Sequence, residues 1–102
     1  MSASYTFTAE LWLWSAQDSW HFVTVPAAIS DEIADATSGL KRGFGSVPVE
    51  AHVGATRWRT SIFPSKTESA YVLPVKQQVR SAEGLTLDQH FEVTLVLRQA
   101  SS

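Results

Sequence analysis

The sequence predicts a mainly β protein, a single six-stranded β-barrel with one or two short helices. Six stretches alternate apolar and polar residues, as strands with one buried face do, and short polar or glycine-containing turns separate them. A chain of 102 residues with 44% hydrophobic residues is long enough to bury one core. We therefore expect a single domain over residues 1–102, with the barrel at about 4–98 and a frayed tail at 99–102.

The first two predicted strands are residues 4–14 and 20–25. The apolar face of the first strand consists of Tyr5, Phe7, Ala9, Leu11 and Leu13. This apolar face is well marked, and the other face also becomes apolar at Trp12 and Trp14. A polar turn separates the two strands, and Pro26 closes the second.

Residues 26–38 change to helical spacing, with apolar residues at Ile29, Ile33 and Ala36. Asp31 and Glu32 stand where we expect the first turn, a position at which the helix dipole favours acids. Ser30 is the predicted N-cap, and Gly39 is the predicted C-terminal stop.

The central stretch, residues 42–64, reads as an antiparallel hairpin. Alternate apolar residues mark its first strand, and Gly54-Ala55 supplies a tight turn in which glycine adopts positive φ without steric cost. In the second strand Trp58, Thr60 and Ile62 share one face and Arg57, Arg59 and Ser61 share the other.

Two further strands are predicted at residues 70–75 and 90–98. Pro74 lies inside the first of these and indicates an edge or a bulge, because proline donates no ladder hydrogen bond. Between them, residues 76–82 could form one or two helical turns that end at Gly84. The last strand has the clearest alternation, with Phe91, Val93, Leu95 and Leu97 facing one way.

Charge is distributed unevenly along the chain. The net charge is −2, yet residues 1–40 contain no Lys or Arg, whereas residues 41–80 contain seven. This asymmetry indicates either an anion-binding face or an acidic and a basic segment packed side by side, and we favour the second interpretation. With no cysteine and no run of about 18 apolar residues, we expect a cytoplasmic protein without disulfides, thiolate ligands or membrane helices.

Five segments occur here in an order that resembles one protein family. They are WHFVTVP (20–26), RGFGSVPVEAHVG (42–54), WRTSIFP (58–64), YVLPVKQQVR (71–80) and FEVTLVL (91–97). The order resembles the small bacterial family of domain of unknown function 1905 over about residues 5–98. Residues 87–90 (LDQH) replace the Gly-Asp turn that the family usually has. The resemblance implies a double-split β-barrel, a fold shared with swapped-hairpin transcription factors and antitoxins, and implies no activity.

Several kinds of active site lack support in the sequence. The histidines at 21, 52 and 90 lie on three separate strands without metal-ligand spacing, so we expect solvated positions for them. Ser61 has no nucleophile elbow, and Arg42-Gly43-Phe44-Gly45 lacks the Gly-Lys-Ser/Thr ending of a phosphate loop. The ten acidic residues are dispersed. We therefore predict no metal, no cofactor and no catalytic residue.

The best functional candidate is basic. Lys76 and Arg80 stand four residues apart on the predicted helical turn, while Arg59 and Ser61 share one side of the hairpin. If the two elements are neighbours, these four side chains could hold a small anion through charge-assisted hydrogen bonds. A solvated basic face is the competing interpretation. Of the tryptophans, Trp12, Trp14 and Trp58 could belong to the core or to a surface platform, and we favour the core for most.

The sequence therefore predicts a non-enzymatic module that binds a small anionic ligand or a partner protein. An enzyme acting on an anionic substrate through the basic cluster and a DNA-binding barrel remain alternatives. The net charge of −2 and the acidic first forty residues disfavour nucleic acid. The sequence leaves the oligomeric state open, and a homodimer is one option.

Overall fold

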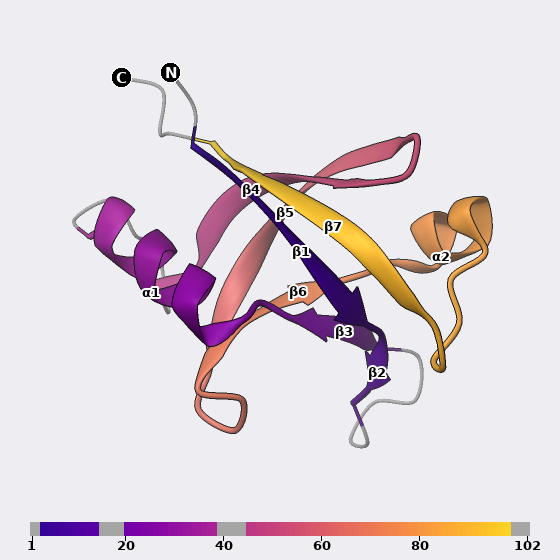
Figure 1. Cartoon of the computed structure of the whole chain (residues 1–102), viewed down its shortest axis with the longest axis horizontal. Coiled ribbons are helices and arrows are strands. Elements are labelled where there is room, and N and C mark those ends of the chain that lie inside the picture. The colour runs from indigo at the N-terminus through magenta and orange to yellow at the C-terminus, as the bar shows by residue number, and fades with distance from the viewer. Residues whose placement is uncertain (1–2, 15–19, 39–44, 99–102) are drawn as a thin grey trace.

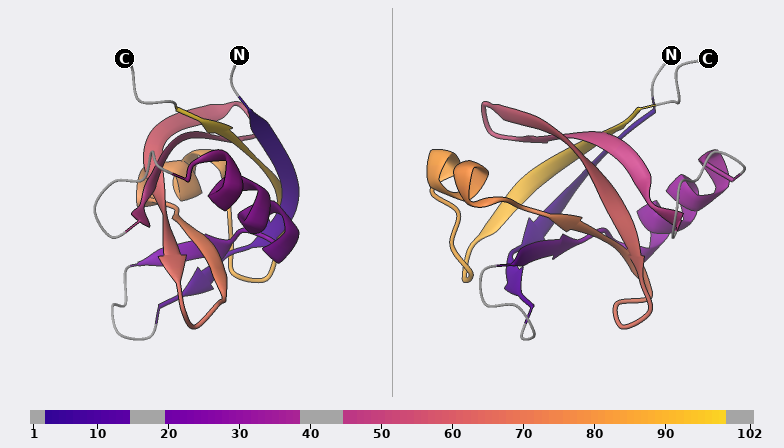
Figure 2. Two further views of the ribbon diagram at one scale, coloured as in Figure 1. Left: turned by 90° about the vertical axis from the view of Figure 1, so that its left-hand side faces the viewer. Right: turned by 180° about the vertical axis from the view of Figure 1, so that it is seen from behind.

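The structure, a computed structural model, describes residues 3–14, 20–38 and 45–98. In these ranges seven antiparallel strands form one sheet in the order β1-β7-β4-β5-β6-β3-β2 (Figure 1). The strands are β1 (Ser4–Glu10), β2 (Trp12–Leu13), β3 (His21–Thr24), β4 (Val47–Val53), β5 (Thr56–Ser65), β6 (Ala70–Pro74) and β7 (His90–Leu97). The sheet curls into a half-barrel (Figure 2), which confirms the predicted mainly β architecture.

The seventh strand arises from a break in the stretch that we predicted as one strand over residues 4–14. β1 pairs with β7, and after Leu11 the chain pairs instead with β3 as β2. The side chain of Leu11 is buried at this break. The two strands at opposite ends of the sheet order are therefore consecutive in the chain, which explains how the sheet curls round one core.

The core fills the inside of the curled sheet. β4 alternates buried and half-buried residues along its whole length, and the inward residues of β5, β6 and β7 face it. The largest fully buried side chains are Ile33, Ile62, Leu73, Leu95, Val23, Val25, Val49, Val79 and Val93. The inward assignment of Val93 and Leu95 from the alternation of the last strand is therefore confirmed.

The helix α1 (Ala27–Ala36) lies across one end of the curled sheet (Figure 2). It begins earlier than predicted: Pro26 is its N-cap residue, so the predicted N-cap Ser30 is wrong. Ser30 is buried inside the helix, where its hydroxyl donates to the Val25 carbonyl and accepts from the Tyr71 amide. The serine thus ties α1 to β6 instead of capping the helix. The predicted stop at Gly39 lies outside the described residues.

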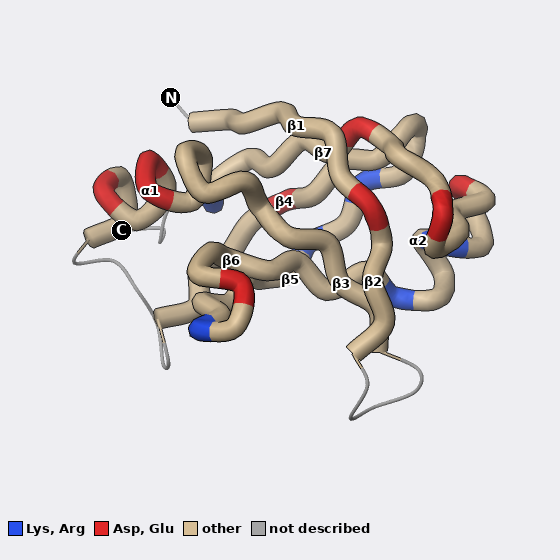
Figure 3. The backbone as a smooth tube through the Cα atoms, turned by 60° about the horizontal axis from the view of Figure 1, so that its bottom comes forward, with Lys and Arg blue, Asp and Glu red and all other residues tan. Residues whose placement is uncertain are grey.

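The helix α2 (Gln77–Glu83) forms at the opposite end of the long axis (Figure 1). Gly84 ends it in the left-handed conformation with φ 63°, as predicted, because glycine takes this conformation without steric cost. The acidic residues of α1 and the basic residues of α2 therefore lie far apart (Figure 3). Among the described residues, no ion pair joins an acid of residues 1–40 to a Lys or Arg of residues 41–80. Neither described helix is long and apolar enough to cross a membrane.

Candidate functional site

A split opens between β5 and β6 because Pro74 interrupts their ladder. Val25 donates to the Tyr71 carbonyl and Val75 donates to the His21 carbonyl, so the odd-numbered residues of β6 bond to β3. Ladder groups alternate in direction, so the backbone of Ala70, Val72 and Pro74 faces β5. Proline offers no N–H there, and the β5–β6 pairing ends at Phe63 and Val72. β6 is thus an internal strand, not the edge strand that Pro74 indicated, and only its side toward β5 is open at Pro74.

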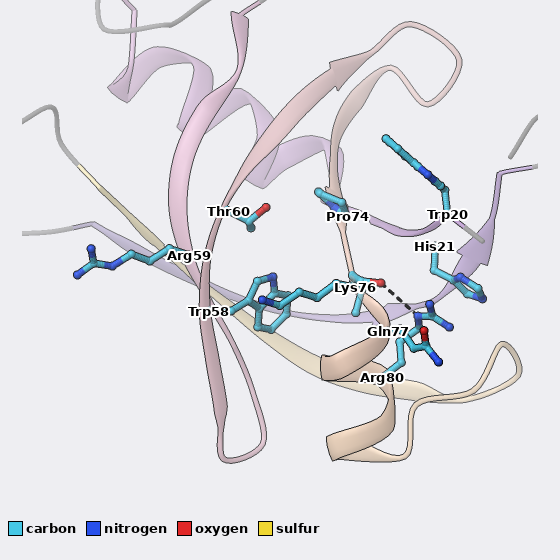
Figure 4. Close-up of a pocket in the computed structure, with 10 residues that line it drawn as sticks. Trp20, His21, Trp58, Arg59, Thr60, Pro74, Lys76, Gln77 and Arg80 are labelled. Atoms are coloured by element: carbon cyan, nitrogen blue, oxygen red, sulfur yellow. Dashed lines mark hydrogen bonds between the residues drawn. The ribbon is translucent and has the colours of Figure 1, made fainter. Parts of the chain in front are cut away.

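The split holds a pocket of about 410 Å³, a volume within the range of small-molecule sites. Its walls come from β5, from the end of β6 with the start of α2, and from the beginning of β3 (Figure 4). Trp58 contributes the buried wall and Pro74 the opposite one. Trp20 stands at the rim, with 51% of its surface exposed. The lining is more apolar than polar, which suits a ligand with an apolar body.

Lys76 and Arg80 bring positive charge to this pocket. The Nε atom of Arg80 donates to the Val75 carbonyl at 3.2 Å, which fixes the guanidinium group at the base of α2. Lys76 is the N-cap residue of α2, and its side chain extends toward β5 (Figure 4). Neither cation forms an ion pair with any acidic residue in the part of the chain that is described. Both charges therefore have capacity for an anion.

Arg59 and Ser61 relate differently to the pocket. Arg59 is a lining residue, but Figure 4 shows its side chain pointing away from Lys76, across β5. The backbone of Arg59 therefore lines the pocket, while its guanidinium group lies on the outer face of the sheet. Ser61 shares that outer face and pairs with Pro48. The structure thus places Lys76 and Arg80 on the lining of one pocket, with their side chains extending in opposite directions (Figure 4), and leaves the two β5 side chains outside the pocket.

The sequence reasoning missed Trp20 as a site residue. Trp20 stands two residues before Phe22, so the alternation of the second predicted strand already placed both on one face. In the structure their ring centroids are 6.0 Å apart, and Trp14 lies 5.9 Å from Trp20. Of the three tryptophans left open by the sequence, Trp58 is core, Trp12 is half-buried and Trp14 is exposed.

The histidines do not gather into one site. His52 Nε2 lies 2.9 Å from a carboxylate oxygen of Glu50, and His90 Nε2 lies 3.2 Å from one of Glu10. The hydrogen bond from His52 lowers the pKa of Glu50, and the charges of Arg57 and Arg59 act in the same direction. No group of three metal-ligating side chains occurs among the described residues. These pairs are surface contacts of the sheet and show no catalytic arrangement.

Comparison with known proteins identifies the family of this fold but assigns no role to the pocket. The model of the family described as a domain of unknown function (DUF1905) matches residues 7–95. This match covers most of the chain and confirms the resemblance seen in the sequence. No curated protein matches the chain.

Proposed function

The chain belongs to the family of domain of unknown function 1905, and we propose that it is a small-ligand-binding domain whose ligand occupies the pocket between β5 and α2. The observation that carries this proposal is that two cations line the same pocket as apolar side chains. Lys76 and Arg80 supply the charge, while Trp58, Pro74 and, at the rim, Trp20 supply the apolar lining. The ligand class that fits is a small anion with a flat apolar body, such as an aromatic carboxylate.

The two parts of the pocket favour different parts of such a ligand. A carboxylate gains charge-assisted hydrogen bonds from the Lys76 ammonium group, which are stronger than neutral ones, and the charge of Arg80 in the same pocket adds attraction. An aromatic ring gains contact with the tryptophan faces and removes apolar surface from water. The wall alone would not select for charge, and exposed cations alone would bind weakly in salt.

Benzoate tests the proposal as the probe, with thermal unfolding as the measurement. A ligand at a hundred times its dissociation constant stabilises the fold by about 2.7 kcal/mol, which corresponds to a rise in Tm of roughly 10–20 °C for a domain of this size. We expect Lys76→Met to unfold near the wild-type temperature without ligand, because the Lys76 side chain makes no hydrogen bond within the described structure. This variant should lose most of the shift that benzoate causes.

Arg80→Met should lose less of the benzoate shift than Lys76→Met, because the guanidinium group extends away from β5 (Figure 4). Its starting Tm should be slightly lower, because the bond to the Val75 carbonyl disappears. Arg98→Met is the matched control, since Arg98 follows β7 and does not line the pocket. Benzamide keeps the ring without the charge, and acetate keeps the charge without the ring. The proposal is wrong if benzoate does not raise the Tm of the wild type, or if it raises the Tm of the Arg98 and Lys76 variants equally.

A further inference from the structure

The backbone of β5 presents hydrogen-bonding groups to the pocket. The β4–β5 hairpin closes at Val53 and Thr56 around a two-residue turn, in which Gly54 has φ 57°. The closing pair of such a hairpin is hydrogen-bonded, and the pairs alternate from there. Thr60 therefore bonds to β4, while the N–H and C=O groups of Arg59 and Ser61 point away from β4.

Nothing in the described structure pairs with these groups of Arg59 and Ser61. β6 pairs with β5 only from Phe63 to Ser65, and no other backbone or side-chain hydrogen bond reaches the two residues. Pro74 would stand opposite Ser61 if the register continued, and it has no N–H to offer. Part of the pocket wall is therefore an open strand edge inside the sheet.

We propose that this edge takes the carboxyl-terminal end of an extended polypeptide, which adds as a short strand between β5 and α2. The inference rests on the proposed function for the carboxylate, which Lys76, whose side chain extends toward β5, would hold. An open edge offers both donors and acceptors, so a simple anion would satisfy the N–H groups and be repelled by the carbonyls. A peptide backbone complements both kinds of group, as in other cases of strand addition.

Charge and shape fix which end of a peptide fits. Lys76 at the start of α2 and Arg80 in its last turn attract a terminal carboxylate and repel a terminal amine. With its carboxylate at α2, the peptide would carry its last side chain toward Trp58, which lies across the pocket from Trp20. An apolar, β-branched or aromatic sequence that ends in a free carboxylate is therefore the expected partner chemistry.

The probe is the peptide acetyl-Thr-Val-Thr-Phe with a free carboxylate, titrated into the full chain and followed by NMR and amide hydrogen exchange. Without peptide, the amides of Arg59 and Ser61 should exchange quickly and that of Thr60 slowly, because only Thr60 bonds to β4. With peptide, the exchange of Arg59 and Ser61 should slow by about tenfold or more, as for one added hydrogen bond. Thr60 serves as the internal control.

Two N-methylated versions of the peptide test the strand geometry. Alternate N–H groups of a strand face its partner, so methylation of one of two adjacent residues should abolish binding and methylation of the other should be tolerated. The carboxamide version and the Lys76→Met variant should both bind at least about tenfold more weakly than the acid and wild type. No substitution in β5 is needed, so a folding defect cannot obscure the result.

The failure of this inference is distinguishable from failure of the proposed function. If benzoate stabilises the protein while the peptide leaves the Arg59 and Ser61 amides unprotected, strand addition is wrong and anion binding stands. Strand addition is also wrong if both N-methylated peptides bind like the parent peptide. If the peptide protects both amides but the carboxamide binds equally well, the edge is a strand site and the carboxylate assignment is wrong. Slow exchange of both amides without peptide, lost on dilution, would identify a second copy as the occupant.

Discussion

The outer faces of the two halves of the curled sheet differ sharply in chemistry. The half formed by β1, β7, β4 and the first part of β5 carries polar ladders on its outside. The hydroxyls of Thr6 and Thr94 are 2.9 Å apart, and Glu50 and His52 form their pair on the same face. Such groups are fully compatible with water, so this half has a single buried face, the core side.

The half formed by the second part of β5, β6, β3 and β2 carries aromatic residues on its outside. Trp12 lies 5.2 Å from Phe22 between ring centroids, and Trp14 lies 6.4 Å from Phe22. Phe22 and Val72 are buried, yet neither belongs to the main core cluster. The aromatic rings therefore form a second, smaller apolar cluster on the outer face.

β5 belongs to both halves and shows the change within one strand. Its outward residues are Arg57, Arg59 and Ser61 and then the exposed Phe63. The change occurs where the pairing of β5 changes, because β5 pairs with β4 up to Ile62 and with β6 from Phe63 onward. The apolar outer face borders the pocket through Trp20 and Pro74. The proposed ligand site therefore adjoins the aromatic half of the sheet, whereas the outer face of the polar half is suited to contact with water.

The largest expected effect contrasts the core side with the outer side of β7. Val93→Asp should abolish folding or nearly so, because it buries a charge with no partner, and such changes cost about 4 kcal/mol or more. Val93 is fully buried, whereas Val96 faces outward and is half-buried beside Glu50. Val96→Thr should therefore change the free energy of unfolding little. An unchanged Tm for Val93→Asp would show that the inward assignment of β7 is wrong.

A smaller effect is expected on the outer faces themselves. Phe22→Ala should destabilise the protein by about 2–4 kcal/mol in denaturant unfolding, since it removes the ring around which Trp12, Trp14 and Trp20 pack. Thr94→Ala, on the polar outer face, removes one exposed hydrogen bond and should cost about 1 kcal/mol or less. Equal losses in the two variants would mean that the aromatic cluster contributes no more than the polar ladder.

Local pattern accounts for what the sequence predicted well. Strict alternation predicted that Val93 and Leu95 face the core, and it placed Arg59 and Trp58 on opposite faces of their strand. Gly84 predicted the end of α2 because few residues other than glycine adopt its backbone conformation without strain. These features depend on residues close together in the chain, so a single sequence contains the information.

The features that the sequence did not predict depend on pairing between distant segments. The break at Leu11 exists because β1 and β2 have different partners, and no local pattern specifies those partners. Ser30 was predicted to be the N-cap. The sequence could not show that its hydroxyl instead accepts a hydrogen bond from the Tyr71 amide, which is distant in the chain. The divergence of β5 from β6 separates the Arg59 side chain from Lys76. Pro74 indicated an interruption in the strand ladder, but the sequence does not specify that the interruption separates β6 from β5 and not from β3.

The smallest expected effect concerns the pKa of Glu50 on the polar face. The hydrogen bond from His52 is the main reason for its lowered pKa, and the charges of His52, Arg57 and Arg59 contribute further. His52→Ala should therefore raise the pKa of Glu50 toward its ordinary value, and Arg59→Met should raise it less. NMR titration of the Glu50 side-chain carboxyl measures both changes. His90→Ala is the control, because His90 pairs with Glu10 and not with Glu50.

The same pair sets a small pH dependence of stability. Because the folded pKa of Glu50 is lowered, the contribution is fully present above the unfolded pKa, about 4.3 for glutamate, and is lost as the pH falls through the folded value. Glu50 is exposed to solvent, so the loss should be slight and should diminish further in high salt. A Glu50 pKa that is identical in wild type and His52→Ala would show that the 2.9 Å contact does not persist in solution. The polar face would then be a set of independently solvated side chains, and its contrast with the packed aromatic face would be greater.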